Sequence, residues 1–285
     1  MKFHPVRYFF LILILRLAGA RSSQAQVTNP QPPKAAVQQS GLTWTESFEG
    51  SGNTDGFITD INSTFGYAFN AHFSVDSGIA YSFVQPATSK TGTTSISGFG
   101  NPYLGMTYSR KSDALNYSTS VNGSIPTATA AKGLSTGRVT FDWNNHFDHE
   151  YDSVTPFVNL GIANSVPDTR YFHHPYISLG KLAHFEAGPE FDLGDKWSVT
   201  ASGYYILPWG AQKIYVRGKR KSPGGTSGGA SLTRDAGANI GLDYDLSRFL
   251  DLSAGYSYSS YYSFNTFSFG IAVNVASMLK TRRRD

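Results

Sequence analysis

Histidines near carboxylates are the first side chains to consider for chemistry, because imidazoles and carboxylates bind metals and transfer protons. His146, His149 and Glu150 lie close together, and His173 and His174 are adjacent. Neither group has the helical His spacing of a hydrolytic metal site. The chain has no Cys, so thiolate ligands and disulfides are excluded. We therefore expect no metal and no cofactor.

A serine beside a histidine base is the second arrangement that could do chemistry. The chain has one His-x-Ser sequence, His72-Phe73-Ser74. It falls in a predicted turn, and no third group that would orient the histidine is evident. We therefore expect no catalytic residues and no enzyme activity.

The elements that must position these residues are strands, because apolar and polar residues alternate from about Gly41 onward. No comparable helical stripe appears. The clearest alternating runs are these: Phe65, Tyr67 and Phe69; Phe73, Val75, Ser77, Ile79, Tyr81 and Phe83; Leu115, Tyr117, Thr119, Val121, Gly123 and Ile125; and Ala236, Ala238, Ile240, Leu242, Tyr244 and Leu246.

The connections between these runs alternate in length. Short polar turns are expected at 70–72, 111–113, 148–152, 194–196 and 247–248, and longer Gly, Ser, Thr and Pro segments at 49–56, 85–97, 127–135, 164–175, 209–232 and 259–263. Short turns on one rim and long loops on the other are typical of outer-membrane barrels. The sequence therefore predicts an all-β fold, a transmembrane antiparallel up-and-down β-barrel of about 12 strands over residues 41–279. A soluble β-sandwich is the alternative.

The N-terminus indicates export. Lys2 and Arg7 precede the apolar run 8–15, and small residues follow up to Ala25, which predicts a signal peptide over residues 1–25. Residues 26–40 are rich in Gln, Pro and Ala and are expected to form a flexible periplasmic leader, while 280–285 form a basic C-terminal tail. These features predict the bacterial outer membrane as the location.

Charge argues against nucleic acid as a partner. The net charge is +4, and the predicted signal peptide accounts for four positive residues, so the mature chain is near neutral. Only 15% of residues are charged, against roughly 25% in an ordinary soluble domain. Much of the surface must therefore consist of uncharged side chains, and we expect outer-membrane lipids to contact it.

Strand parity predicts which polar residues face the inside of the barrel. If Phe185 and Phe191 face lipid, the alternate positions point inward and set the selectivity of any path through the barrel. The predicted lumen-lining residues are Arg138, Asp142, His146, His184, Glu186, Glu190, Tyr204 and Asn239. These residues could instead pair with one another as a polar barrel core. Glu46 and Lys181 fall on the apolar parity and are exceptions to the pattern.

Residues 98–142 carry a resemblance to a known family. The stretch 98–106 reads GFGNPYLGM, a strand ends in Ile125-Pro126-Thr127, and Ser135-Thr136-Gly137 follows the next loop. This order resembles the outer-membrane family of phenol-degradation meta-pathway channels, although Ala128 replaces the Gly of that family's Pro-Thr-Gly. The resemblance implies a barrel that passes aromatic compounds, and it supplies no binding residue.

We therefore expect a porin-like passive channel or uptake pore for small, hydrophobic or aromatic solutes. Its expected partners are the small-molecule solute and the barrel assembly machinery. The alternative is a non-conducting structural or adhesive barrel whose long loops bind other molecules. A barrel lipase using His72 and Ser74 is a third and weaker alternative, suggested by twelve-stranded outer-membrane phospholipases.

Overall fold

A computed structural model describes residues 41–87, 95–168, 174, 176–217, 225–276 and 279. The predicted signal peptide (1–25), the leader (26–40) and the basic tail (280–285) lie outside the described residues. No helix within the described part of the chain is long and apolar enough to cross a membrane.

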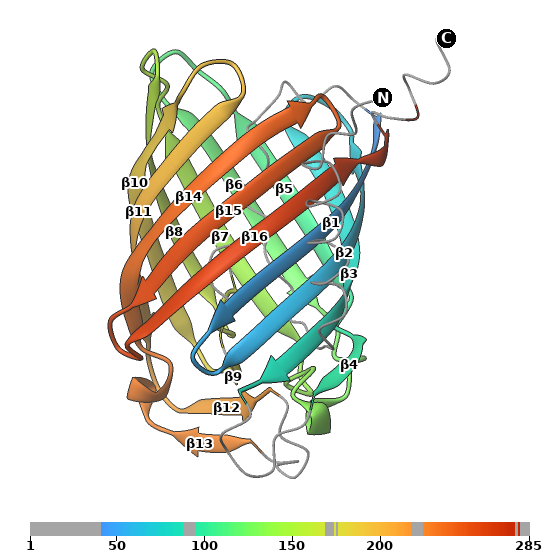
Figure 1. Ribbon diagram of the computed structural model, residues 1–285, viewed down its shortest axis with the longest axis vertical. Coiled ribbons are helices and arrows are strands. Elements are labelled where there is room, and N and C mark those ends of the chain that lie inside the picture. Colours follow the sequence, from blue (N-terminus) through green and yellow to red (C-terminus); the bar gives the residue numbers. More distant parts are fainter. Residues whose placement is uncertain are drawn as a thin grey trace, which may run out of the picture.

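Twelve antiparallel strands form a closed barrel (Figure 1), which confirms the predicted fold. The strands are β1 (Gly41–Asn53), β2 (Gly56–Ala68), β3 (Phe73–Pro86), β5 (Tyr103–Arg110), β6 (Asn116–Ser124), β7 (Thr140–Asp148), β8 (Val154–Ala163), β10 (Leu182–Asp192), β11 (Trp197–Pro208), β14 (Asp235–Ser247), β15 (Leu250–Ser259) and β16 (Phe264–Asn274). Each strand pairs with the next one along the chain, and β1 pairs with β16 from Thr45 opposite Asn274 to Gly52 opposite Phe267. That last pairing closes the sheet, so no barrel edge is left unpaired.

The fourth strand position is filled by two pieces. β3 pairs with β4 (Ile96–Phe99) at one end and with β5 at the other. Between the two pieces, Pro102 has no backbone N–H to donate to a neighbouring strand. The Asn101 side chain instead accepts a hydrogen bond from the Ala128 backbone N–H at 3.1 Å. This bond connects the break in the strand to the loop after β6.

A second, three-stranded sheet lies beyond one rim of the barrel. It contains β9 (Tyr176–Leu179), β12 (Gln212–Val216) and β13 (Thr226–Gly228), with β12 in the centre. Two short 3₁₀ segments, η1 (Ala130–Lys132) and η2 (Ala230–Leu232), lie in the loops of the same rim. Figure 1 shows β12 and β13 crossing below the lower end of the barrel.

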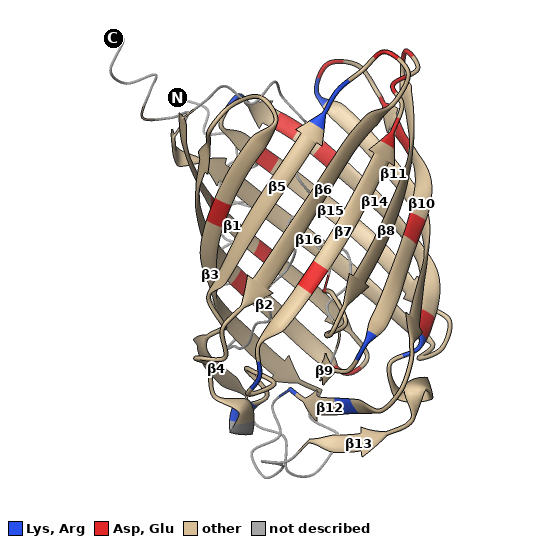
Figure 2. Cartoon of the chain, turned by 180° about the vertical axis from the view of Figure 1, so that it is seen from behind, with Lys and Arg blue, Asp and Glu red and all other residues tan. Residues whose placement is uncertain are grey.

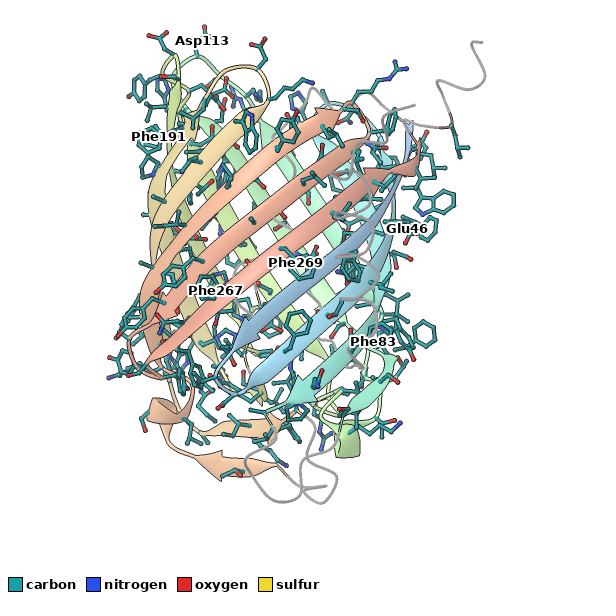
Figure 3. The ribbon with its side chains drawn as sticks, in the orientation of Figure 1. Glu46, Phe83, Asp113, Phe191, Phe267 and Phe269 are labelled. Carbon is teal, nitrogen blue, oxygen red and sulfur yellow. The ribbon has the colours of Figure 1, made fainter. Side chains whose placement is uncertain are left out.

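The outer surface of the barrel is apolar, as the alternation predicts. Phe267 is 66% exposed and Ile240 is 54% exposed, whereas their sequence neighbours Thr266 and Asn239 are buried. Figure 3 shows Phe83 and Phe191 projecting from opposite sides of the barrel, away from its axis. Exposed apolar side chains on every strand are stable only against hydrocarbon, so this surface spans a membrane.

The two rims differ as predicted, with one correction. β1 begins and β16 ends at the rim that also carries the connections between β2 and β3, β5 and β6, β7 and β8, β10 and β11, and β14 and β15. Both chain ends and short turns belong to the periplasmic side of such barrels. The predicted long loop at 49–56 is wrong, because β1 continues to Asn53 and turns directly into β2. The small residues at 50–53 resemble a loop in the sequence, but in the structure they pair with β2.

The two exceptions to the outward apolar pattern are resolved differently. Glu46 does face outward (Figure 3), but its carboxylate accepts hydrogen bonds from the Trp44 indole and the Ser63 hydroxyl, both at 2.7 Å. Lys181 lies just outside β10, at the loop rim, so it is not at the middle of the membrane.

The depth of the apolar band can be tested on β14. Ile240 lies near the middle of this strand, while Leu246, 43% exposed on the same face, lies near the periplasmic end. Ile240→Arg is expected to lower the free energy of unfolding by about 2–4 kcal/mol, and Leu246→Arg by about 0–1 kcal/mol. Urea titration of the protein folded in lipid vesicles measures both. Equal costs at the two positions would contradict a membrane-spanning exterior.

Candidate functional site

The inner wall of the barrel is the candidate functional site. We use this name for the inward-facing residues of the twelve strands. On β7, Phe141 and Trp143 are exposed to the outside, so the alternate residues Asp142 and His146 point inward. The strand register extends this assignment to the neighbouring strands, because paired residues share one side of a sheet.

A chain of hydrogen bonds begins on β7 and crosses β8. His146 Nε2 lies 3.0 Å from Asp148 Oδ2, and His146 Nδ1 lies 2.8 Å from Asn159 Oδ1. The Asn159 amide then donates to Glu186 Oε2 on β10 at 3.2 Å. Three adjacent strands are thereby joined by side chains on the inner wall, in addition to their backbone pairing.

The same chain continues from Glu186 across the next three strands. The Ser202 hydroxyl of β11 donates to Glu186 Oε1 at 2.6 Å, and the Asn239 amide of β14 donates to the same oxygen at 3.3 Å. Ser257 of β15 donates to Asn239 Oδ1 at 2.6 Å. We call the six-strand chain from Asp148 to Ser257 the inner belt. The predicted residues His146, Glu186 and Asn239 all belong to it.

Two further predicted residues form a pair beside this belt. His184 Nε2 on β10 lies 2.8 Å from Asp142 Oδ1 on β7, so the contact passes over the intervening strand β8. Gly161 of β8 lies beneath the imidazole, and a Cβ atom there would collide with it. The glycine therefore gives the ring space to reach Asp142.

Tyr204 is held near the loop-side rim. Its hydroxyl donates to Asp235 Oδ2 at 3.0 Å, and Ser259 donates to Asp235 Oδ1 at 2.6 Å. Asp235 is fully buried by these contacts and by the strand ends. The phenol of Tyr204 therefore stands at the mouth of the barrel and not in the inner belt.

The last two predicted residues lie apart from the others. Glu190 is on β10 in the inward register, opposite Thr200 of β11, toward the periplasmic rim. Arg138 precedes β7 in an exposed loop segment, where its backbone bonds to the Thr136 side chain. Arg138 is thus outside the strands, because the loop after β6 extends to Val139 before pairing resumes.

The opposite half of the inner wall carries acidic residues that the sequence analysis did not select. Glu49, Asp60 and Asp76 lie on β1, β2 and β3 in the inward register. The Ser47 hydroxyl donates to Glu49 at 3.0 Å, and Tyr103 forms a hydrogen bond with Asp76. Parity could have found Asp60 and Asp76, because each alternates with outward apolar residues, but Glu49 was assigned to a loop.

The charges of the barrel strands are strongly unequal. Figure 2 shows acidic residues along the strands, whereas basic residues lie near the rims and in the loops. Of the described residues in the twelve barrel strands, the one Lys or Arg is Arg110, at the end of β5 on the outward parity. Acidic residues in the inward register are Glu49, Asp60, Asp76, Asp142, Asp148, Glu186, Glu190, Asp192, Asp235, Asp243, Asp245 and Asp251.

The long loops pack together across the loop-side rim. Arg217 after β12 forms an ion pair with Asp168, and the His174 backbone N–H donates to that carboxylate at 2.8 Å. Asp168 is 1% exposed and Arg217 is 3% exposed. The guanidinium of Arg217 is therefore buried in protein and not solvated. We call this assembly, together with the β9, β12 and β13 sheet, the loop cap.

A tyrosine pair joins the loop cap to a third loop. The hydroxyls of Tyr176 on β9 and Tyr262 before β16 lie 2.9 Å apart, and Tyr262 donates to the Leu232 carbonyl at 2.7 Å. Burial raises the pKa of both phenols. Both groups therefore stay neutral and hydrogen-bonded through the physiological pH range.

The remaining candidates for chemistry are occupied by local contacts. His72 Nδ1 lies 2.9 Å from the Ser109 carbonyl in a periplasmic turn. His149 packs edge-on against Tyr151. In the part of the chain that the structure describes, no group of three His, Asp or Glu residues is placed to hold a metal.

A closed even-stranded barrel with an apolar exterior and a polar interior is an outer-membrane β-barrel, and the bacterial outer membrane is where such single chains reside. No protein-family model matches the chain, and no curated protein matches it in sequence. Its fold is similar to that of an outer membrane channel from Pseudomonas putida F1, with 10% identity, a TM-score of 0.58, and coverage of 87% of this chain and 99% of that one. The NanC porin is also similar, with 6% identity, a TM-score of 0.50, and coverage of 80% and 99%. At these identities the likeness is one of fold.

The buried ion pair of the loop cap gives a local prediction. Arg217→Met leaves the Asp168 carboxylate buried without its guanidinium, a change that costs about 3–5 kcal/mol. Since the cap lies outside the barrel, we expect faster amide hydrogen exchange in β9 and β12, with unchanged exchange in the barrel strands. Lys213→Met is the control, because it removes one positive charge from the neighbouring strand β12, where the Lys213 ammonium lies over the Tyr215 ring. Unchanged exchange in β9 and β12 would show that the pair does not hold the cap.

Proposed function

We propose that this protein is a passive channel that lets small solutes cross the outer membrane. The observation that carries the proposal is the polar inner wall of a closed, membrane-spanning barrel of twelve strands. Barrels of eight strands can fill their interior with side chains, whereas twelve strands enclose a wider interior. Inward hydroxyl, amide and carboxylate groups favour water and polar solutes in that space.

The preference for hydrophobic or aromatic solutes is a finer proposal, and its support is the resemblance of residues 98–142 to the phenol-degradation meta-pathway channels. The inner wall offers few apolar groups for such solutes. In the described strands, Phe157 of β8, Phe264 of β16 and the phenols of Tyr103 and Tyr204 are the phenyl and phenol side chains in its inward register. We therefore regard a general path for small polar solutes as the function that the geometry supports best.

The loop cap is part of this proposal. It lies across the loop-side rim in both views of the barrel (Figures 1 and 2), so a solute entering from outside the cell meets it first. Folded loops at the mouth of a barrel restrict the size of what can enter. We infer an upper limit of permeation set by the cap and not by the diameter of the barrel.

Liposome swelling tests the channel. We expect liposomes that contain the folded protein to swell in small sugars, with a rate that falls as the sugar grows, because the loop cap narrows the entrance to the path. A matched series of aromatic acids and aliphatic acids of the same charge tests the finer preference, which predicts faster uptake of the aromatic members. Folding is verified by the heat-dependent gel mobility of the barrel.

Two outcomes would redirect the proposal. Folded protein that gives neither swelling nor single-channel openings would favour the non-conducting structural or adhesive barrel. Phospholipid hydrolysis that is abolished by Ser74→Ala would favour the barrel lipase. The recognition of the chain by the barrel assembly machinery is a separate proposal, which depletion of that machinery in cells tests directly.

A further inference from the structure

We propose that the inner wall makes this channel selective for cations, so that its substrates are small cationic or neutral solutes and anions are disfavoured. The inference deepens the proposed function and rests on it. It depends on the sign of the charge that the wall presents to the interior, which the structure determines residue by residue.

The first step concerns Glu186, the carboxylate of the inner belt that lies near mid-depth on β10. Glu186 accepts hydrogen bonds from Asn159, Ser202 and Asn239, all of which are neutral donors. Hydrogen bonds to the ionised form stabilise the carboxylate without cancelling its charge. Glu186 therefore differs from Asp168, whose charge is cancelled by Arg217 in the loop cap.

The second step is that other inner acids, on both halves of the wall, are held by hydroxyl or imidazole groups and not by Lys or Arg. Asp235 takes its bonds from the Tyr204 and Ser259 hydroxyls, and Asp76 from the Tyr103 phenol. Asp142 is paired with His184, an imidazole that carries charge only when protonated. Inward-register carboxylates thus come from β3, β7, β10 and β14. Asp235 of β14 is buried near the loop-side rim, so β3, β7 and β10 present theirs to the interior.

The third step is that no described barrel strand supplies an inward Lys or Arg to offset these acids. Arg110 is the single such residue of the described strands, and it lies on the outward parity at a rim. A wall of one charge sign surrounded by low-dielectric material concentrates counter-ions and excludes co-ions. Rings of Asp and Glu select cations in other channels by this same effect.

The size of the expected preference for cations over anions follows from Coulomb's law. A monovalent ion that passes about 5 Å from one carboxylate in water is enriched about fourfold if it is a cation and depleted about fourfold if it is an anion. Salt screens this effect, with a Debye length of about 10 Å at 0.1 M and about 30 Å at 0.01 M. Selectivity is therefore expected to grow as the salt is diluted.

The test is the reversal potential of the folded full-length protein in a planar bilayer between about 0.1 M and about 0.01 M KCl. We expect the sign of a potassium-selective path, with a permeability ratio of potassium to chloride above about 4. Glu186→Gln, which keeps the shape and hydrogen-bonding capacity of the side chain, is expected to lower the ratio by about two- to fourfold. Asp142→Asn is a second, independent variant with the same expected direction.

The matched control is Asp113→Asn, which removes the same charge from an exposed periplasmic turn (Figure 3) and is expected to leave the ratio nearly unchanged. A ratio near one, a preference for chloride, or an equal response to Glu186→Gln and Asp113→Asn would overturn the inference while leaving the channel in place. Folded protein with no openings at any voltage would overturn the proposed function, and the inference with it.

Discussion

The pairing of β1 with β16 is the constraint on which the rest of the structure depends. A membrane interior offers no water to satisfy backbone N–H and C=O groups, so a sheet can cross it only as a closed cylinder. Closure joins Thr45 to Asn274 and Gly52 to Phe267, strands that lie at opposite ends of the barrel sequence. Once the sheet is closed, each strand has one side toward hydrocarbon and one toward the interior.

The two sides then follow opposite chemical rules. Outside, apolar side chains such as Ile240 and Phe267 are exposed because lipid is their solvent. Inside, polar side chains must find partners, and the inner belt supplies them across six strands through residues such as Glu186 and Asn239. Glu46 is a polar exception on the outer surface, and its carboxylate is stabilised by hydrogen bonds from Trp44 and Ser63.

Charge is distributed by the same logic. The loop cap, which is made of protein packed on protein, neutralises Asp168 with Arg217. The inner wall instead surrounds Glu186 with hydroxyl and amide donors and pairs Asp142 and Asp148 with histidines. Lys and Arg lie near the rims and in the loops (Figure 2). A wall that needed only structural stability could have paired its acids with arginines. The absence of such arginines from the described strands is what connects this architecture to selective permeation.

The sequence by itself determined the strand period, the inward parity of residues such as Asp142, His184 and Glu186, and the number of strands, because alternation and turn chemistry are local signals. It did not determine that Glu49 belongs to a strand, since the small residues after it resemble a loop until β2 pairs with them. Nor did it place Arg138 outside the strands or bury Arg217 against Asp168, which lies 49 positions earlier in the chain. Contacts between distant segments depend on register and closure, and only the tertiary structure decided them.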